Sequence, residues 1–218
     1  MKQIWLEDIE QKLLPQLQIS SEQPYDPIVV HHVPKPWRLV GSGNYAAVVM
    51  HPSYPEIVVK VYAPGRPGLS EEKEVYQRLG KHEAFSECLH EGESYLVLRR
   101  LTGVTLYMCL RRGIPIPRKV LQDIDRALDY ARSRGLSPHD VHGKNVMMKD
   151  GSGLVVDVSD FLKEEYCPMW DDLKRAYDRF YYPWIRRIPF PEFMLHLVRR
   201  GYRKWKKWIL LFHHLNKK

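Results

Sequence analysis

Cysteine is scarce in this sequence, and long apolar runs are absent. The 218 residues include three cysteines, Cys88, Cys109 and Cys167, and no two of them form a CxxC pair. An odd and widely spaced set argues against a disulfide framework or a structural zinc site and is typical of a reducing compartment. Because there is neither an apolar run of about 18 residues nor a signal-peptide pattern after Met1, we expect a soluble, cytoplasmic protein.

Acidic residues are also scarce near the C-terminus. Residues 179–218 contain one acid, Glu192, against eleven lysines and arginines, whereas the whole chain carries a formal net charge of +8. The rest of the chain is therefore almost neutral, and any acidic partner should bind this basic part. Within 199–218 the apolar residues recur at helical spacing. Three interpretations stay open: the helix docks its aromatic residues on the body of the protein, lies on an anionic membrane surface, or contacts nucleic acid.

Hydrophobic periodicity divides the chain into a β-rich first part and a mostly helical second part. Residues 1–36 are predicted to hold an N-terminal helix (4–14) and a proline-rich connector. The further predicted elements are two strands within 37–63 joined by a turn at 52–55, a helix over 68–80 with Ser70 as N-cap and Gly80 as C-cap, a strand over 94–101, a helix over 117–134, a hairpin over 145–158 and helices beyond Asp171. This order predicts an α+β protein with two unequal lobes.

A glycine-rich turn, Gly41-Ser42-Gly43, lies between two β-like stretches. Its backbone can turn tightly and approach the phosphates of a ligand, but the same residues also form ordinary hairpin turns. The turn by itself does not decide between a phosphate-binding loop and an ordinary hairpin turn.

Lys60 interrupts the apolar run IVVKVY. A buried ammonium group needs a partner because an unpaired buried charge is costly. The acids of the next predicted helix, Glu71, Glu72 and Glu74, could supply that partner. Alternatively, Lys60 points outward from an edge strand, and the run alone does not choose between the two arrangements.

The polar segment 139–145, HDVHGKN, and Asp157 flank the predicted hairpin. A hairpin brings its two ends together, so we expect Asn145 and Asp157 to be neighbours. An amide oxygen with a carboxylate suits Mg²⁺, which also binds phosphate oxygens and water. Asp140, in the same loop, is then a candidate base. The alternatives are a zinc site built on the two histidines of the loop, for which no further Cys/His cluster supplies ligands, and a polar loop without chemistry.

In their order along the chain, the glycine turn, strand lysine, helix glutamate, Asp-x4-Asn loop and aspartate after the hairpin resemble the protein-kinase-like fold over about residues 37–175. The resemblance implies a two-lobed fold with a β-rich, nucleotide-binding N-lobe (37–101) and a mostly helical, truncated C-lobe (102–218) that carries the catalytic loop and the basic helix 199–218. It implies ATP and Mg²⁺ as cofactors. The site residues that it implies are Gly41, Ser42, Gly43, Val48, Lys60, Glu72, Arg99 and Leu101 for ATP, Asn145 and Asp157 for the metal, and Asp140 with Lys60 for catalysis.

Several residues depart from the pattern of that family. Ala46 replaces the third loop glycine, Pro138-His139-Asp140 stands where His-Arg-Asp is usual, and Val158-Ser159 replace Phe-Gly. The DVHGKN loop is closer to that of phosphotransferases acting on antibiotics and sugars. Only ten residues, 161–170, separate DVSD from the aspartate pair Asp171-Asp172, and the Ala-Pro-Glu motif is missing, as in RIO-type kinases. The sequence thus most resembles small bacterial serine/threonine protein-kinase-like proteins.

Further aspartates lie near the C-terminal side of the hairpin. Asp172, in MWDDL, resembles the helix aspartate that braces the catalytic loop of the family, with Asp171 as the fallback. Asp160 either binds metal, caps the next helix or pairs with a base.

The expected activity is that of an ATP-dependent phosphotransferase that transfers the γ-phosphate to a hydroxyl. The acceptor favoured by the resemblance is a serine or threonine of a protein. A small-molecule kinase is the nearest alternative, favoured by the DVHGKN loop and the missing docking segment. A pseudokinase is a third candidate, and an adaptor whose basic helix binds nucleic acid or an anionic membrane surface is a fourth. Retention of Lys60, Asp140, Asn145 and Asp157 argues against a pseudokinase, because a scaffold needs no catalytic base.

Overall fold

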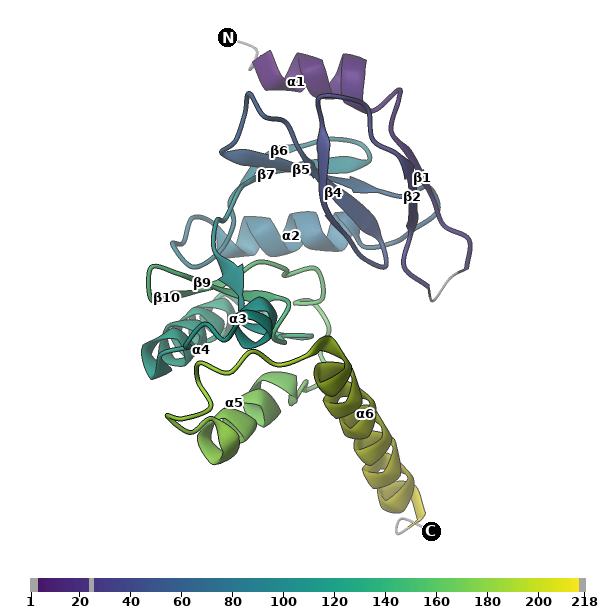
Figure 1. Ribbon diagram of the computed structural model, residues 1–218. Coiled ribbons are helices and arrows are strands. Elements are labelled where there is room, and N and C mark those ends of the chain that lie inside the picture. Colours follow the sequence, from purple (N-terminus) through teal and green to yellow (C-terminus); the bar gives the residue numbers. More distant parts are fainter. Residues whose placement is uncertain (1–3, 24–25, 216–218) are drawn as a thin grey trace.

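The structure is a computed structural model that describes residues 4–23 and 26–215, without the side chains of 203 and 205–215 (Figure 1). The chain forms two lobes, and the first and last helices lie at opposite ends of the molecule. The first lobe is built on a five-stranded sheet, and the second is mostly helical with a small sheet of three strands. This arrangement confirms the predicted α+β, two-lobed fold class.

The sheet of the first lobe has the strand order β3-β4-β5-β7-β6, and all neighbours are antiparallel. Its strands are β3 (Arg38–Ser42), β4 (Ala46–Met50), β5 (Ile57–Tyr62), β6 (Cys88–Glu91) and β7 (Tyr95–Arg99). The helix α2 (Leu69–Leu79) covers one face of this sheet. The other face is covered by α1 (Ile4–Asp8) and the π-helical turn η1 (Ile9–Leu13), whose Ile9 and Leu13 are fully buried.

A two-stranded sheet precedes the main sheet. It consists of β1 (Gln18–Ser20) and β2 (Val29–His32), and Ile28 beside β2 packs against Ala47 and Ala63. The proline-rich connector predicted within 1–36 therefore contains a β-hairpin. In the sequence, the prolines of this stretch indicate a connector. Proline is, however, tolerated in edge strands as well as in turns, so its presence does not exclude short strands.

The second lobe begins with β8 (Val104–Thr105), which pairs with the predicted hairpin in the order β10-β9-β8. The hairpin strands are β9 (Val146–Lys149) and β10 (Ser152–Val155). The helices are α3 (Leu106–Arg112), α4 (Arg118–Ser133), α5 (Met169–Phe180) and α6 (Glu192–Leu215). Gly153 lets β10 approach α4 closely, because a Cβ atom there would lie 2.4 Å from the Val120 carbonyl oxygen. Among the described residues, no helix combines the length and the apolar character needed to cross a membrane.

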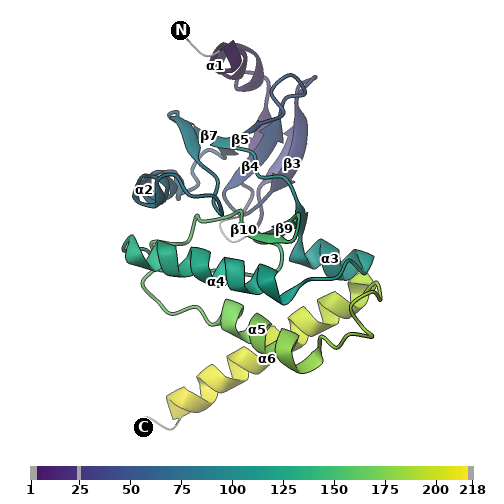
Figure 2. The same cartoon turned by 90° about the vertical axis from the view of Figure 1, so that its left-hand side faces the viewer.

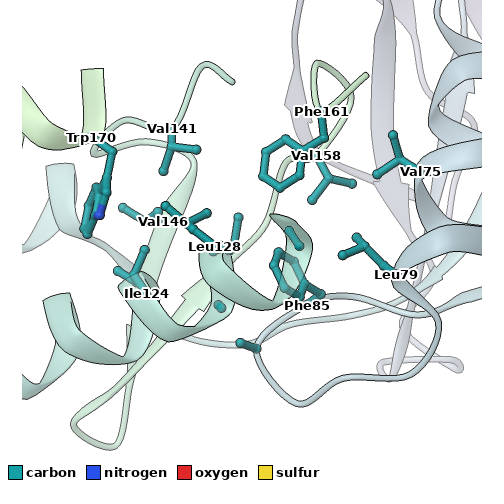
Figure 3. Packing of buried hydrophobic residues seen from close by; sticks show 14 of the residues in the cluster. Val75, Leu79, Phe85, Ile124, Leu128, Val141, Val146, Val158, Phe161 and Trp170 are labelled. Carbon is teal, nitrogen blue, oxygen red and sulfur yellow. The ribbon is translucent and has the colours of Figure 1, made fainter. Parts of the chain in front are cut away.

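One apolar cluster runs through both lobes. It joins Val75 and Leu79 of α2, Leu128 of α4, and Phe85 and Phe161 of the intervening segments (Figure 3). The rings of Phe85 and Phe161 meet edge-on, with centroids 6.4 Å apart. Because the lobes share this core, side chains from β5, α2 and the hairpin are held in a fixed relation to one another.

Two local predictions differ from the structure. The stretch 37–50 forms two strands, so that Gly41 and Ser42 belong to β3 and only Gly43 lies in the turn. Ser70 is not the N-cap of α2, since the helix begins after Gly68, and the Ser70 hydroxyl bonds the Glu71 carboxylate. The elements β6, β8 and α3 were not predicted. Gly80 is the C-cap of α2, as predicted.

Candidate active site

Strand β5 presents Lys60 to helix α2. Alternate residues of a strand point to opposite faces of its sheet. Val59 and Val61 accordingly join the cluster beneath α1 and η1, whereas Lys60 and Tyr62 face α2. The Nζ atom of Lys60 lies 2.6 Å from Oε2 of Glu72. Since β5 is the central strand of the sheet, the edge-strand alternative for Lys60 is wrong.

Glu72 is the buried acid of α2, with 1% of its surface exposed. It accepts hydrogen bonds from the Lys60 ammonium and from the Tyr62 hydroxyl. The other two candidate partners on this helix, Glu71 and Glu74, are exposed. Burial lowers the pKa of Lys60, but the carboxylates of Glu72 and Asp157 outweigh that effect and raise the pKa above its ordinary value. Lys60 is therefore a charged ammonium at neutral pH.

Asp157 follows β10 and completes this group of charges. Its Oδ1 atom lies 3.5 Å from the Nζ of Lys60, and it accepts hydrogen bonds from the Ser159 amide (3.2 Å) and hydroxyl (2.9 Å). Burial raises the pKa of Asp157, but Lys60 and the Ser159 donors together lower it below its ordinary value. Asp157 is therefore ionised at neutral pH, which is the state that a metal cation requires.

The loop before β9 joins Asp140 to Asn145. Asp140 adopts a left-handed conformation (φ 55°), which aspartate tolerates better than most residues. Its backbone carbonyl accepts a hydrogen bond from the side-chain amide of Asn145 at 3.1 Å. The Asn145 carbonyl in turn accepts from the Val156 amide at 3.0 Å, one residue before Asp157. The two ends of the hairpin thus adjoin, as predicted.

The carboxyl of Asp140 has a pKa above its ordinary value. Burial is the main cause, and the carboxylates of Asp160 and Asp157 act in the same direction, while His142 and His139 oppose them. The Nε2 atom of His142 lies 3.9 Å from Oδ2 of Asp140. A carboxylate with a raised pKa accepts a proton more readily than an exposed aspartate does, which suits a general base.

Asn145 and Asp157 offer hard oxygen donors of the kind that Mg²⁺ prefers. Because the amide nitrogen of Asn145 bonds the Asp140 carbonyl, its amide oxygen is the atom that could bind a cation. Among the residues whose side chains the structure describes, no three His, Cys, Asp or Glu side chains gather as metal ligands. The zinc alternative built on His139 and His142 therefore gains no support.

The glycine turn lies at the tip of β3 and β4. A Cβ atom at Gly41 or Gly43 would meet no heavy atom within 4 Å, so the backbone there is open to a ligand. The Gly43 amide donates to the Ala46 carbonyl at 3.0 Å, which closes the turn. Val48 pairs with Lys60 in the β4–β5 register, so the turn leads directly to the lysine.

The segment after β7 connects the two lobes. The Arg99 amide donates to the Glu87 carbonyl at 2.8 Å, and the Arg99 carbonyl accepts from the Ser86 hydroxyl at 2.6 Å. A carbonyl oxygen has two lone pairs and can accept once more. Leu101 is half-buried. The adenine-binding role of Arg99 and Leu101 stays a prediction.

The remaining aspartates have partners that the structure records. Asp160 pairs with Lys163 at 2.9 Å, in agreement with the alternative that it pairs with a base. Asp172 accepts hydrogen bonds from Arg175 of α5 and from Tyr202 of α6. The bracing role of Asp172 on the catalytic loop stays a prediction.

Comparison with known proteins identifies the family. No family model matches the chain. Over 169 residues, however, it is 31% identical to "Putative serine/threonine-protein kinase YrzF" of Bacillus subtilis (strain 168), and the alignment covers 76% of this chain and 79% of that protein. The chain belongs to the protein-kinase-like superfamily.

Solved structures that match this kinase-like chain include two crystal structures of the Mycobacterium tuberculosis PknI kinase domain, one of a double mutant and one of a single mutant. Both are 23% identical to it, with TM-scores of 0.41 and 0.40. The alignments cover 56% and 59% of this chain and the same shares of the PknI chains, so the chain spans less than two thirds of either PknI domain.

Two polar side chains of the site were not predicted. Tyr62 donates to Glu72, and Ser159 donates twice to Asp157. Tyr62 could have been found, because it lies two residues after Lys60 and must therefore share its face of the strand. Ser159 follows Asp157 by two residues, the spacing of an Asx-type turn, so its position also carried a signal.

Proposed function

We propose that this kinase-like protein is an ATP-dependent phosphotransferase that transfers the γ-phosphate to a serine or threonine hydroxyl of a protein. Residues 37–101 would form the nucleotide-binding lobe and 102–218 the catalytic lobe. The main support is the charge arrangement Glu72–Lys60–Asp157, whose members come from α2, β5 and the segment after β10. The pKa of Lys60 is raised and that of Asp157 is lowered, and shifted ionisable groups that converge between two lobes are typical of functional sites.

Each charged residue has a place in such a transfer. Bound ATP with Mg²⁺ supplies the phosphoryl group and the charge that the site must neutralise. Lys60, held by Glu72, would position the α- and β-phosphates. Asp157 and Asn145 would hold the metal, and Asp140 would accept the proton of the attacking hydroxyl. Positioning and neutralisation of charge account for most of the catalysis in this class of reaction.

Backbone groups would hold the rest of the nucleotide. Gly41, Ser42 and Gly43 would cover the phosphates, since open space surrounds both glycines. Val48, beside Lys60 on the neighbouring strand, would contact the base. The Arg99 carbonyl, which can accept a second hydrogen bond, and the Leu101 amide would bond the adenine edge.

A small-molecule hydroxyl is the second candidate acceptor, and one observation favours it. The chain between Asp157 and α5 is short, and Val158 and Phe161 within it are buried in the core that joins the lobes (Figure 3). Little of this segment is left to bind an extended peptide. A compact acceptor would need less surface there.

Incubation of the purified protein with γ-labelled ATP and Mg²⁺ tests the proposal. Asp140→Asn should reduce transfer by about 10²-fold or more if Asp140 is the base. The matched control is Asp150→Asn in the β9–β10 turn, where the aspartate also has a positive φ, of 50°. Asparagine tolerates that conformation, so both variants should fold, and only Asp140→Asn should lose activity.

The location of the label separates the acceptors. Label on protein that disappears in Asp140→Asn supports a protein kinase, whereas label on an added metabolite supports a small-molecule kinase. Binding of ATP without transfer to any acceptor would indicate a pseudokinase. If the protein did not bind ATP, the proposal would be wrong.

A further inference from the structure

Helix α6 is attached to the second lobe by polar contacts. Near its start, Glu192 bonds Arg111 of α3 at 2.8 Å, and further along the helix the Tyr202 hydroxyl bonds Asp172 of α5 at 2.5 Å. Figures 1 and 2 show that the helix then continues away from the lobe. The polar contacts hold one side of α6 and leave another side without cover by the second lobe.

The uncovered side carries large apolar residues. Phe193, Leu197 and Val198 are 67%, 70% and 69% exposed, and Met194 is 43% exposed. Their spacing of three and four residues places them next to one another on the helix surface. Apolar side chains are commonly exposed singly, but a contiguous group on one helix face marks a binding surface. We call these four residues the apolar face of α6.

Basic residues border the apolar face. Arg200 follows Leu197 by three residues and Lys204 follows Arg200 by four, and both are exposed. The one acid in residues 179–218, Glu192, is already paired with Arg111. A second copy of this helix would bring like charges together, which disfavours self-association through the face. The partner of the face must therefore be both apolar and negatively charged.

A lipid surface meets both requirements better than a nucleic acid does. Phosphates of either would pair with Arg200 and Lys204. A nucleic acid, however, offers no apolar layer in which the aliphatic side chains of Leu197 and Val198 could be buried, whereas the boundary between headgroups and acyl chains does. We propose that α6 lies flat on an anionic lipid bilayer, with its apolar face at the acyl boundary and its basic border among the lipid phosphates.

Flotation of the full chain with lipid vesicles tests this proposal. The protein should float with vesicles of phosphatidylcholine and phosphatidylglycerol and not with vesicles of phosphatidylcholine alone. Leu197→Glu should weaken the binding at least about tenfold, the effect of losing one buried leucine side chain. The matched control is Ile4→Glu, since Ile4 of α1 is 75% exposed and lies at the other end of the molecule. It should float like the unchanged protein.

The basic border is tested in the same assay. Arg200→Gln should weaken binding to anionic vesicles, and added salt should weaken it further, because the attraction is electrostatic. Arg38→Gln on the exposed strand β3 changes the net charge equally and should have no such effect. Circular dichroism checks that each variant is folded, and Val198→Glu replaces Leu197→Glu should the latter not fold.

Two results would overturn the proposal. One is flotation that Leu197→Glu does not weaken, and the other is no flotation at all. If the protein does not float, binding of a single-stranded oligonucleotide would indicate a nucleic-acid partner, and a dimer in sedimentation that depends on Leu197 would indicate self-association.

Discussion

The buried pair of Lys60 and Glu72 makes a prediction that needs no nucleotide. Glu72→Ala removes the nearer of the two carboxylates around the Lys60 ammonium and the acceptor of the Tyr62 hydroxyl. The Lys60 ammonium then keeps its contact with Asp157, whose Oδ1 atom lies 3.5 Å from the Lys60 Nζ. We expect a large loss of stability because a buried charge and a buried hydroxyl lose their partner together.

The size of the stability loss expected for Glu72→Ala follows from the burial of the ion pair. Removing one member of a buried ion pair costs about 3–5 kcal/mol, out of a total free energy of unfolding of roughly 5–15 kcal/mol. Glu74→Ala is the matched control on the same helix, since Glu74 is 48% exposed and pairs with Arg78 one turn away. An exposed pair of this kind is worth about 0.3–0.5 kcal/mol. Both variants replace glutamate with alanine in α2, so the change in helix propensity cancels.

Urea unfolding at neutral pH measures the two free energies. Glu72→Ala should lower the unfolding midpoint far more than Glu74→Ala, with a difference of about 3 kcal/mol or more. The double variant Lys60→Met/Glu72→Leu should recover part of the loss, because it removes both members of the buried ion pair instead of leaving one of them unpaired. Equal losses for the two alanine variants would refute the buried pairing and, with it, the position given to Lys60.

Three further predictions concern pH and packing. The lowered pKa of Asp157 contributes stability at neutral pH that is lost as the pH falls below its ordinary value of 3.8, so the urea midpoint of Asp157→Asn should depend less on acid than that of the unchanged protein. The raised pKa of Asp140 means that phosphoryl transfer should decline with acidification at a pH above 3.8, because a base must first lose its proton; a pH–rate profile with its acid limb at or below 3.8 would contradict this role. Gly153→Ala should cost about 1–3 kcal/mol in unfolding experiments, since its Cβ would press on the Val120 carbonyl, whereas Gly201→Ala, with open space around it in α6, should stabilise by about 0.5–1 kcal/mol. Similar effects on stability at the two glycines would contradict the close approach of β10 to α4 described above.

The long periodic elements could be predicted from the sequence. Helix α4 runs from Arg118 to Ser133, within one residue of its predicted bounds at either end. The reason is local: apolar residues repeat at helical spacing, and Gly135 with φ 74° ends the helix. The hairpin β9–β10 was equally clear, because Asp150-Gly151 is a strong turn signal between apolar strands.

The short elements could not be found by periodicity. Strand β8 has two residues, Val104 and Thr105, whose pairing with Met147 and Met148 is decided by the fold of the lobe rather than by their own preference. Helix α3 did carry usable signals. The Thr105 hydroxyl caps it by accepting from the Met108 amide at 3.2 Å, and Gly113 ends it in the left-handed conformation.

The candidate site was easier to predict than the elements around it, because its residues are linked by short and well-defined pieces of chain. Asp140 and Asn145 share one loop, and Asp157 lies across a single hairpin from Asn145, so sequence order fixes their neighbourhood. Lys60 and Glu72 are separated by one turn between a strand and a helix. In both cases little freedom remains in where the side chains can lie.

Asp172 shows where this reasoning weakens. Two adjacent aspartates of one helix turn point in directions about 100° apart, so spacing alone cannot say which of Asp171 and Asp172 faces the loop. In the structure Asp171 bonds Tyr166 and Lys174, while Asp172 bonds Tyr202 of α6. The contact with Tyr202 depends on the course of the chain between α5 and α6, which no local pattern encodes. Sequence order therefore supports the role of a residue best where the chain that links it to the rest of the site is short. A residue that is linked to the site through a longer course of chain, such as Asp172, needs a test by its own substitution.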